Sequence, residues 1–238
     1  MEYYGPKENS NIPLNPIEYY MSLSNHTGNL LNTGEFEDSY YSSLLALKLI
    51  KDYPMLNLPR HEIPINNFIV AGVLSEKLEI QTGLELYEQL FDNQTKYADY
   101  ILLLNNYSIL NLLNNNLSAA ENALNEAINF IKSESCIDSY YEYYIGINNV
   151  ILKYLSHNVE EALVNWENLN NKIPNIPDLA FLIRRHQLIG GVLNNREKIN
   201  SKEWLNILIN EHPHELGRPW SFFGKGYLFS DLQFWSES

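Results

Sequence analysis

The fold class is decided by one stretch, NNYSILNLLNNNLSAAENALNEAINFI, at residues 105–131. Apolar side chains recur at helical spacing before the three asparagines 114–116, and they recur again after them. The first set consists of Leu104, Tyr107, Leu110 and Leu113. A short polar break between two such patterns is typical of a helical hairpin. We therefore expect two antiparallel helices joined by a tight turn.

The second half of the stretch carries small residues where two helix axes would approach closely. Ala120, Leu124, Ala127 and Ile131 lie on one helical face there. Four other segments have the same layout, each anchored on one small residue. The five anchors are Ser42, Gly83, Ala120, Ala162 and Ser201, with separations of 41, 37, 42 and 39 residues. A period of about 40 residues predicts stacked helix pairs, with about ten or eleven helices in the whole chain.

The spacing within these units resembles the second helix of a tetratricopeptide repeat (TPR). Ala162, Trp166, Leu169 and Pro174 match that helix best, and Ala120, Leu124 and Ala127 come next. The first-helix signature of the family is mostly missing, and its period is shorter, at about 34 residues. The resemblance implies an all-α fold, a TPR-like α-solenoid of about five helix pairs over residues 1–217, with Trp166 buried. It also implies a protein or peptide ligand.

The end of the chain, residues 218–238, holds a dense run of aromatic side chains, RPWSFFGKGYLFSDLQFWSES. Each such ring removes about 150–250 Å² from water when it is buried, so these rings need cover. The end of a helical array also exposes core that must be covered. We expect this segment to pack on the last repeat as a cap. The alternative is that its rings, Trp220 and Trp235 among them, dock on a partner.

Composition and charge exclude several classes of partner. The 238 residues include 29 acidic and 16 basic side chains, which gives a formal net charge of -13. Such a field repels the phosphates of nucleic acids and the headgroups of anionic lipids. A basic protein or peptide is the partner that this charge favours.

The expected compartment is the cytoplasm. A single cysteine, Cys136, excludes an intrachain disulfide and a cysteine-based zinc site. No segment approaches the apolar length of a membrane span, and the first residues lack the pattern of a secretion signal. The heavy use of asparagine, isoleucine, tyrosine and lysine is typical of an AT-rich genome, such as that of a bacterium.

No set of residues has the spacing of an active site. The closest metal-binding candidate is EHPHE, residues 211–215, but His212 and His214 flank a proline and no matched distant pair accompanies them. The GKG at 224–226 lacks the other residues of a phosphate-binding loop. We therefore expect no enzyme activity, no catalytic residue, no metal and no cofactor.

Asparagines are the first candidates for partner binding. In TPR-like peptide receptors, asparagines of the inner helices clamp a peptide backbone. The resemblance extends this role to Asn105, Asn148 and Asn149, which fall on expected first helices. Asparagine is abundant throughout the chain, so the same residues can equally be read as a feature of composition.

Tyrosines are the second candidates. In SYYEYYIGINNVILKYL, residues 139–155, an apolar stripe runs along one helical face and leaves Tyr141 and Tyr143 outside it. Exposed tyrosines favour interfaces, so we expect these two rings to face away from the core. The alternative is that wide faces in stacked hairpins bury more rings.

Two functions fit these observations. The first is a non-enzymatic module that binds a protein or peptide, either as an adaptor or as a sensor or regulatory subunit. The second is an acidic inhibitor or immunity-type protein that neutralises a basic toxin or effector, for which the net charge of -13 is suitable.

Overall fold

The computed structural model describes residues 15–33, 35–54, 62–92, 99–133 and 139–170, together with Gly190 and Leu193. These residues contain helices and turns and no strand, so the prediction of an all-α chain is confirmed for them. The helices are α1 (Pro16–Thr33), α2 (Phe36–Asp52), α3 (Glu62–Leu74), α4 (Ile80–Asp92), α5 (Asp99–Leu113), α6 (Leu117–Ser133), α7 (Ser139–Leu155) and α8 (Val159–Asn170). The fifth expected helix pair and the aromatic segment 218–238 lie outside the described residues.

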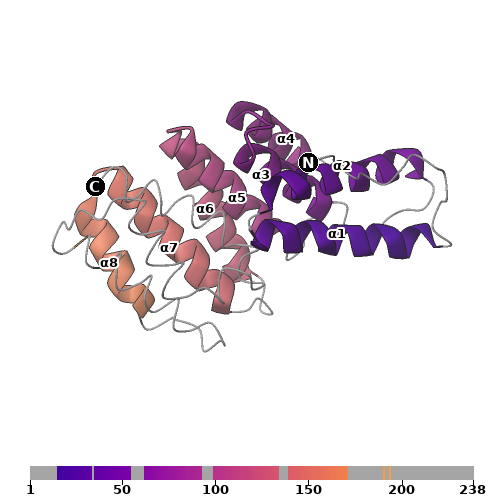
Figure 1. Cartoon of the computed structure of the whole chain (residues 1–238). Helices are drawn as coiled ribbons and strands as arrows, with labels where there is room; N and C mark the ends of the chain where they lie inside the picture. The colour runs from indigo at the N-terminus through magenta and orange to yellow at the C-terminus, as the bar shows by residue number, and fades with distance from the viewer. Residues whose placement is uncertain are drawn as a thin grey trace.

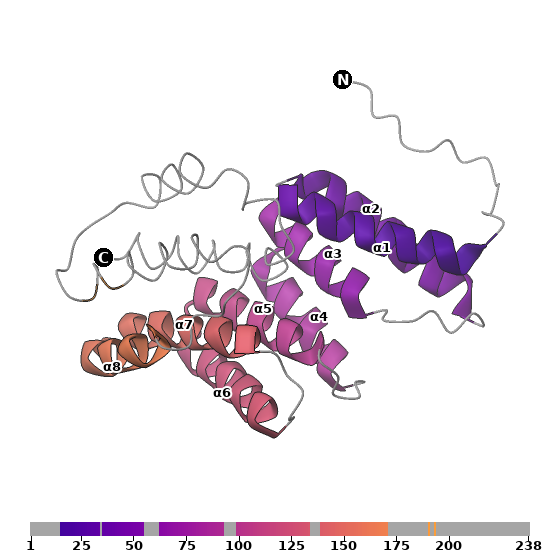
Figure 2. The ribbon, with the colours of Figure 1, turned by 90° about the horizontal axis from the view of Figure 1, so that it is seen from below.

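The eight helices form four hairpins that follow one another in chain order, from α1–α2 to α7–α8 (Figure 1). Each helix packs against the next, and the first helix of each hairpin also contacts the first helix of the following one. In the view of Figure 2, α4, α6 and α8 lie below α3, α5 and α7. The hairpin predicted for residues 105–131 is confirmed as α5 and α6.

The turns inside the last three hairpins have the same backbone geometry. Each contains one residue in the left-handed region: Glu76 at φ 58°, Asn115 at φ 56° and His157 at φ 60°. The next residue donates its amide to a carbonyl five positions back, at 2.8 Å for Lys77 to Gly72, 2.8 Å for Asn116 to Asn111 and 2.9 Å for Asn158 to Lys153. This is the Schellman closure of a helix C-terminus. The recurrence of one closure at intervals of 39 and 42 residues matches the period expected from the sequence.

Small residues of the second helices pack where the helices cross, as expected. Gly83, Ala120 and Ala162 are buried. The anchor assigned to α2 was wrong by one position, because Ser43 is fully buried and Ser42 is only partly buried. Because the two serines are adjacent, the helical spacing of the apolar residues does not decide which of them lies on the buried face.

Two further expectations need correction. The prolines of the stretch YPMLNLPRHEIPIN, residues 53–66, favour a linker between hairpins, but α3 begins inside it at Glu62, with Pro64 in the first turn. Proline is tolerated there because the first amides of a helix have no partner within the helix. Trp166 is partly buried rather than buried: its ring packs against the core and lies so close to Gly190 that a Cβ at that position would overlap it.

The apolar core is divided among three clusters. The largest joins α5, α6, α7 and α8 and includes Ile63 of α3, a second joins α3, α4 and α5, and a third lies between α1 and α2. None of the helices in the described ranges is long and apolar enough to cross a membrane.

Candidate functional site

Six asparagine side chains are buried in the described residues, all on the first helices of three hairpins, and none is more than 4% exposed. One is Asn111 on α5, and the five considered next are Asn66 and Asn67 on α3, Asn105 and Asn106 on α5, and Asn148 on α7. A buried amide without hydrogen-bond partners is costly, so such side chains need partners inside the protein. The positions of the partners show what holds these helices together.

The five amides and Thr27 of α1 form one continuous chain of hydrogen bonds, which we call the amide ladder. The Nδ2 of Asn148 donates to Oδ1 of Asn105 (2.7 Å), Asn105 to Asn106 (3.3 Å), Asn106 to Asn66 (2.9 Å), Asn66 to Asn67 (3.3 Å), and Asn67 to Oγ1 of Thr27 (2.8 Å). The hydroxyl of Thr27 then donates to the carbonyl of Ser24 at 2.7 Å. Every donor points in the same direction along the ladder, from α7 towards α1.

Tyr87 of α4 joins the ladder at its centre. Its hydroxyl donates to Oδ1 of Asn66 at 2.6 Å, so this oxygen accepts two hydrogen bonds. The Tyr87 ring is fully buried, and this burial raises the pKa of its hydroxyl well above the usual range. The hydroxyl therefore stays protonated and acts as a permanent donor to the ladder.

A second buried tyrosine, Tyr20 of α1, offers a contrast. It is 1% exposed, yet its hydroxyl has no hydrogen-bond partner among the described residues; Ser24 donates to the Tyr20 carbonyl instead.

We expect Tyr20→Phe to leave the free energy of unfolding unchanged or raise it, because an unbonded buried hydroxyl is lost. Tyr87→Phe should lower it by about 1 kcal/mol, because a buried hydrogen bond is lost. Urea denaturation of the two variants at pH 7 measures the difference, and equal effects would contradict this account.

The buried hydroxyl of Tyr20 also predicts how the stability of the protein changes at alkaline pH. Burial raises the pKa of the Tyr20 hydroxyl from its ordinary value of 10.0 to about 12. A group whose pKa is higher in the folded state contributes stability that is complete below its unfolded pKa and is lost as pH rises through the folded value. The advantage of Tyr20→Phe over the parent should therefore grow between pH 10 and 12. A constant difference across this range would contradict the assignment.

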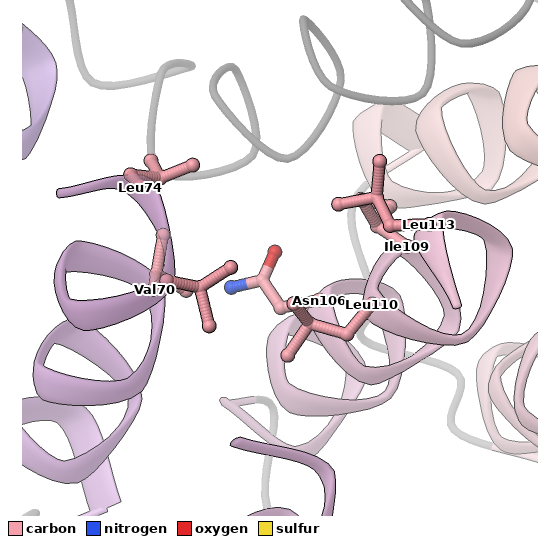
Figure 3. Close-up of a pocket in the computed structure, with 7 residues that line it drawn as sticks. Val70, Leu74, Asn106, Ile109, Leu110 and Leu113 are labelled. Atoms are coloured by element: carbon pink, nitrogen blue, oxygen red, sulfur yellow. The ribbon is translucent and has the colours of Figure 1, made fainter. Parts of the chain in front are cut away.

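A shallow hollow lies between the C-terminal halves of α3 and α5 (Figure 3). It is lined by Val70, Val73 and Leu74 of α3 and by Asn106, Ile109, Leu110 and Leu113 of α5. The amide of Asn106 points from α5 towards α3, between the two apolar walls (Figure 3). Because almost all of the lining is apolar, the hollow suits an aliphatic group rather than a charged one.

Acidic side chains are concentrated on the second helices of the hairpins. α2, α4, α6 and α8 carry Glu37, Asp38, Asp52, Glu85, Glu88, Asp92, Glu121, Glu126, Glu160, Glu161 and Glu167. The first helices carry only Glu18, Glu62, Asp99 and Glu142. On α6 and α8, Glu121 and Glu161 hold Lys153 of α7 at 2.9 Å and 3.2 Å, which ties these helices together. The second helices therefore form the more acidic layer of the hairpins, and the first helices form a less acidic layer that holds the buried amides.

The predicted binding residues fall into three environments. Asn105 and Asn148 are fully buried and bonded to each other, so they are not available to clamp a peptide, whereas Asn149 is partly exposed. Tyr141 is partly buried against the core. The expectation that Tyr143 faces away from the core is wrong, because its ring is fully buried in the largest cluster. Trp220 and Trp235 lie outside the described residues.

Sequence reasoning missed the N-terminal half of the ladder. Asn66 ends the proline-punctuated stretch 53–66, which favours a linker, and neither Asn67 nor Thr27 belongs to a predicted site. The signal was present, since pairs of asparagines recur at 66/67, 105/106 and 148/149, near the period of the hairpins. In the described part of the chain, no three histidine, cysteine, aspartate or glutamate side chains are grouped so that they could hold a metal ion.

No family model, curated protein or solved structure matches the chain. The assignment of function therefore depends on the geometry and charge of its own residues.

Proposed function

We propose that the chain is a TPR-like α-solenoid that acts as a non-enzymatic interaction module, and that its second helices present acidic side chains to a basic protein or peptide. The observation that carries the proposal is the separation of charge between the two helices of each hairpin. In the first helices, α3, α5 and α7 supply buried amides, and in the second helices most acids are exposed. Stacked hairpins turn such a difference into an extended surface of one sign.

Electrostatics supports a basic partner. A net charge of -13 attracts cationic surfaces over a distance of about 8 Å at physiological salt, beyond direct contact. Such attraction mainly raises the association rate and selects partners by charge. The non-enzymatic part of the proposal rests on the sequence, in which no nucleophile, base or metal set has a recognisable spacing.

Two other parts of the proposal come from the sequence. The aromatic segment 218–238 is proposed to cap the array, because the end of a solenoid leaves apolar surface to be covered. A cytoplasmic location is proposed because a single cysteine suits a reducing compartment.

The test compares two triple variants that remove the same charge from different places. Glu85→Gln/Asp92→Asn/Glu167→Gln neutralises exposed acids of the second helices, and Glu18→Gln/Glu35→Gln/Glu76→Gln neutralises exposed acids elsewhere. Each variant is used as bait in a lysate, and retained proteins are quantified by mass spectrometry. The association rate of the most enriched protein is then measured at low and high salt.

The proposal predicts that retained proteins are basic, that the second-helix variant loses them and that the control variant keeps them. Retention of neutral or acidic proteins would contradict it, as would equal losses from both variants. One dominant basic protein, bound tightly and more slowly as salt rises, would favour the inhibitor or immunity-type function over a general adaptor.

A further inference from the structure

The amide ladder crosses every boundary between the described hairpins. The bond from Asn67 to Thr27 joins the second hairpin to the first, the bond from Asn106 to Asn66 joins the third to the second, and the bond from Asn148 to Asn105 joins the fourth to the third. The bonds between neighbouring asparagines on α3 and α5 connect these three crossings. The ladder is therefore a single network that runs through all four hairpins.

Apolar packing is continuous from α3 to α8, because Phe91 and Tyr107 pack against both of the larger clusters, but the buried cluster of the first hairpin is separate from them. The α1–α2 cluster is small, with Tyr20, Leu23 and Ala46 as its buried members. Its links to α3 include the stacked rings of Tyr40 and Phe68, whose centroids are 5.1 Å apart. In stacked-hairpin proteins each unit contacts only its neighbours, so units with weak interfaces unfold separately. The amide ladder adds to this packing a hydrogen-bonded link at each boundary, including the one between the separate first cluster and α3.

We propose that the amide ladder is a coupling device that makes the four described hairpins one cooperative unit and fixes the register in which their first helices stack. A shift of one helical turn at any crossing would place a buried amide opposite an apolar side chain, leaving a donor and an acceptor unpaired. Only one register of the first helices allows the hydrogen bonds at all three crossings to form together. This inference is independent of the proposed function, because it concerns the interior alone.

Asn66 is the position at which the ladder is most sensitive. Its oxygen accepts from Asn106 and from Tyr87, and its own amide donates to Asn67. Asn66→Ala removes all three bonds and separates the ladder into a part on α1–α3 and a part on α5–α7. Asn111 provides a matched control, since it is 1% exposed and its amide donates to the carbonyl of Tyr107, within the same helix and outside the ladder.

Native-state hydrogen exchange of backbone amides tests the proposal. In the parent, the slowest amides of all four hairpins should exchange at one common rate, set by global unfolding. In Asn66→Ala, the slowest amides of α1–α4 should exchange at least about ten-fold faster than those of α5–α8. In Asn111→Ala, all four hairpins should remain at one common rate, even if that rate rises.

Three results would overturn the coupling role: separate rates in the parent, a single common rate in Asn66→Ala, or equal separation in Asn111→Ala. If Asn66→Ala does not fold, Asn148→Ala at the end of the ladder decides the question. In that variant α7–α8 should exchange faster than the first three hairpins. A common rate in Asn148→Ala would then contradict the proposal.

Discussion

Tyr143→Ala is expected to lower the free energy of unfolding by about 3–5 kcal/mol, the usual cost of deleting a fully buried aromatic side chain. Tyr143 is 0% exposed and belongs to the largest apolar cluster, among residues of α5 to α8. Removing its ring leaves a cavity that rigid neighbouring helices fill only in part. A loss of this size is a large fraction of the total stability of an ordinary domain.

The control for this prediction is Tyr141→Ala, two residues earlier on α7. Tyr141 is only partly buried, so its removal should cost clearly less than that of Tyr143. Urea denaturation followed by circular dichroism gives both values. If Tyr141→Ala cost as much as Tyr143→Ala, or more, the face of α7 assigned to the core would be wrong.

Gly72→Leu is expected to cost about 3 kcal/mol through overpacking. A Cβ at position 72 would lie 2.9 Å from the Cβ of Leu78 and 3.2 Å from two ring carbons of Tyr40. These neighbours cannot move freely, because Leu78 follows the turn that closes α3 and the Tyr40 ring stacks on Phe68. A longer side chain at position 72 would force the second hairpin away from α2.

Alanine variants at two glycines provide the matched comparison for this prediction. A Cβ at position 146 would lie 2.5 Å from Cδ2, 3.2 Å from Cδ1 and 3.3 Å from Cγ of Leu169, so the end of this side chain would have to shift. Gly146→Ala should therefore cost less than Gly72→Ala, because the end of the Leu169 side chain shifts more readily than the Cβ of Leu78, while alanine favours the helix by about 1 kcal/mol at both positions. Gly72→Ala should be destabilising despite the same gain. Thermal and urea denaturation of the two variants measure the contrast, and the reverse order would contradict the packing described for α3.

The sequence predicts the hairpins well because their signals are local. The break at 114–116 ends one helical pattern and begins another, and the structure has α5 and α6 on either side of it. Neighbouring acids in the sequence favour the start of a helix, and the structure has Glu37 and Asp38 in the first turn of α2 and Glu160 and Glu161 in that of α8. Both features depend on neighbouring residues alone.

The side of a helix that faces the core is harder to predict. α7 carries tyrosines at four of its first six positions, so apolar periodicity does not single out one face, and Tyr143 was assigned to the wrong side. The same holds for Ser42 and Ser43 in α2. In both helices the choice between adjacent residues is made by contacts with other hairpins, which a single-helix pattern does not contain.

The ladder was missed for a different reason. Asparagine is common along the whole chain, at turns and helix starts as well as in the interior, so its presence at one position carries little information. Asn116 and Asn158, for example, accept backbone amides at the starts of α6 and α8. The hydrogen bond between Asn66 and Asn106 becomes apparent only when α3 and α5 lie side by side, because it joins residues 40 positions apart in the sequence.

The most direct test of the ladder is the exchange of its own side-chain amide protons, followed by NMR on protein labelled with ¹⁵N at asparagine. The ladder donors Asn66, Asn67, Asn105, Asn106 and Asn148 are buried, whereas Asn115 is exposed in a turn and serves as the internal reference. The account predicts that the five buried side-chain amides exchange at least about 100-fold more slowly than that of Asn115. Exchange of the Asn66 and Asn106 side chains at the rate of Asn115 would contradict it.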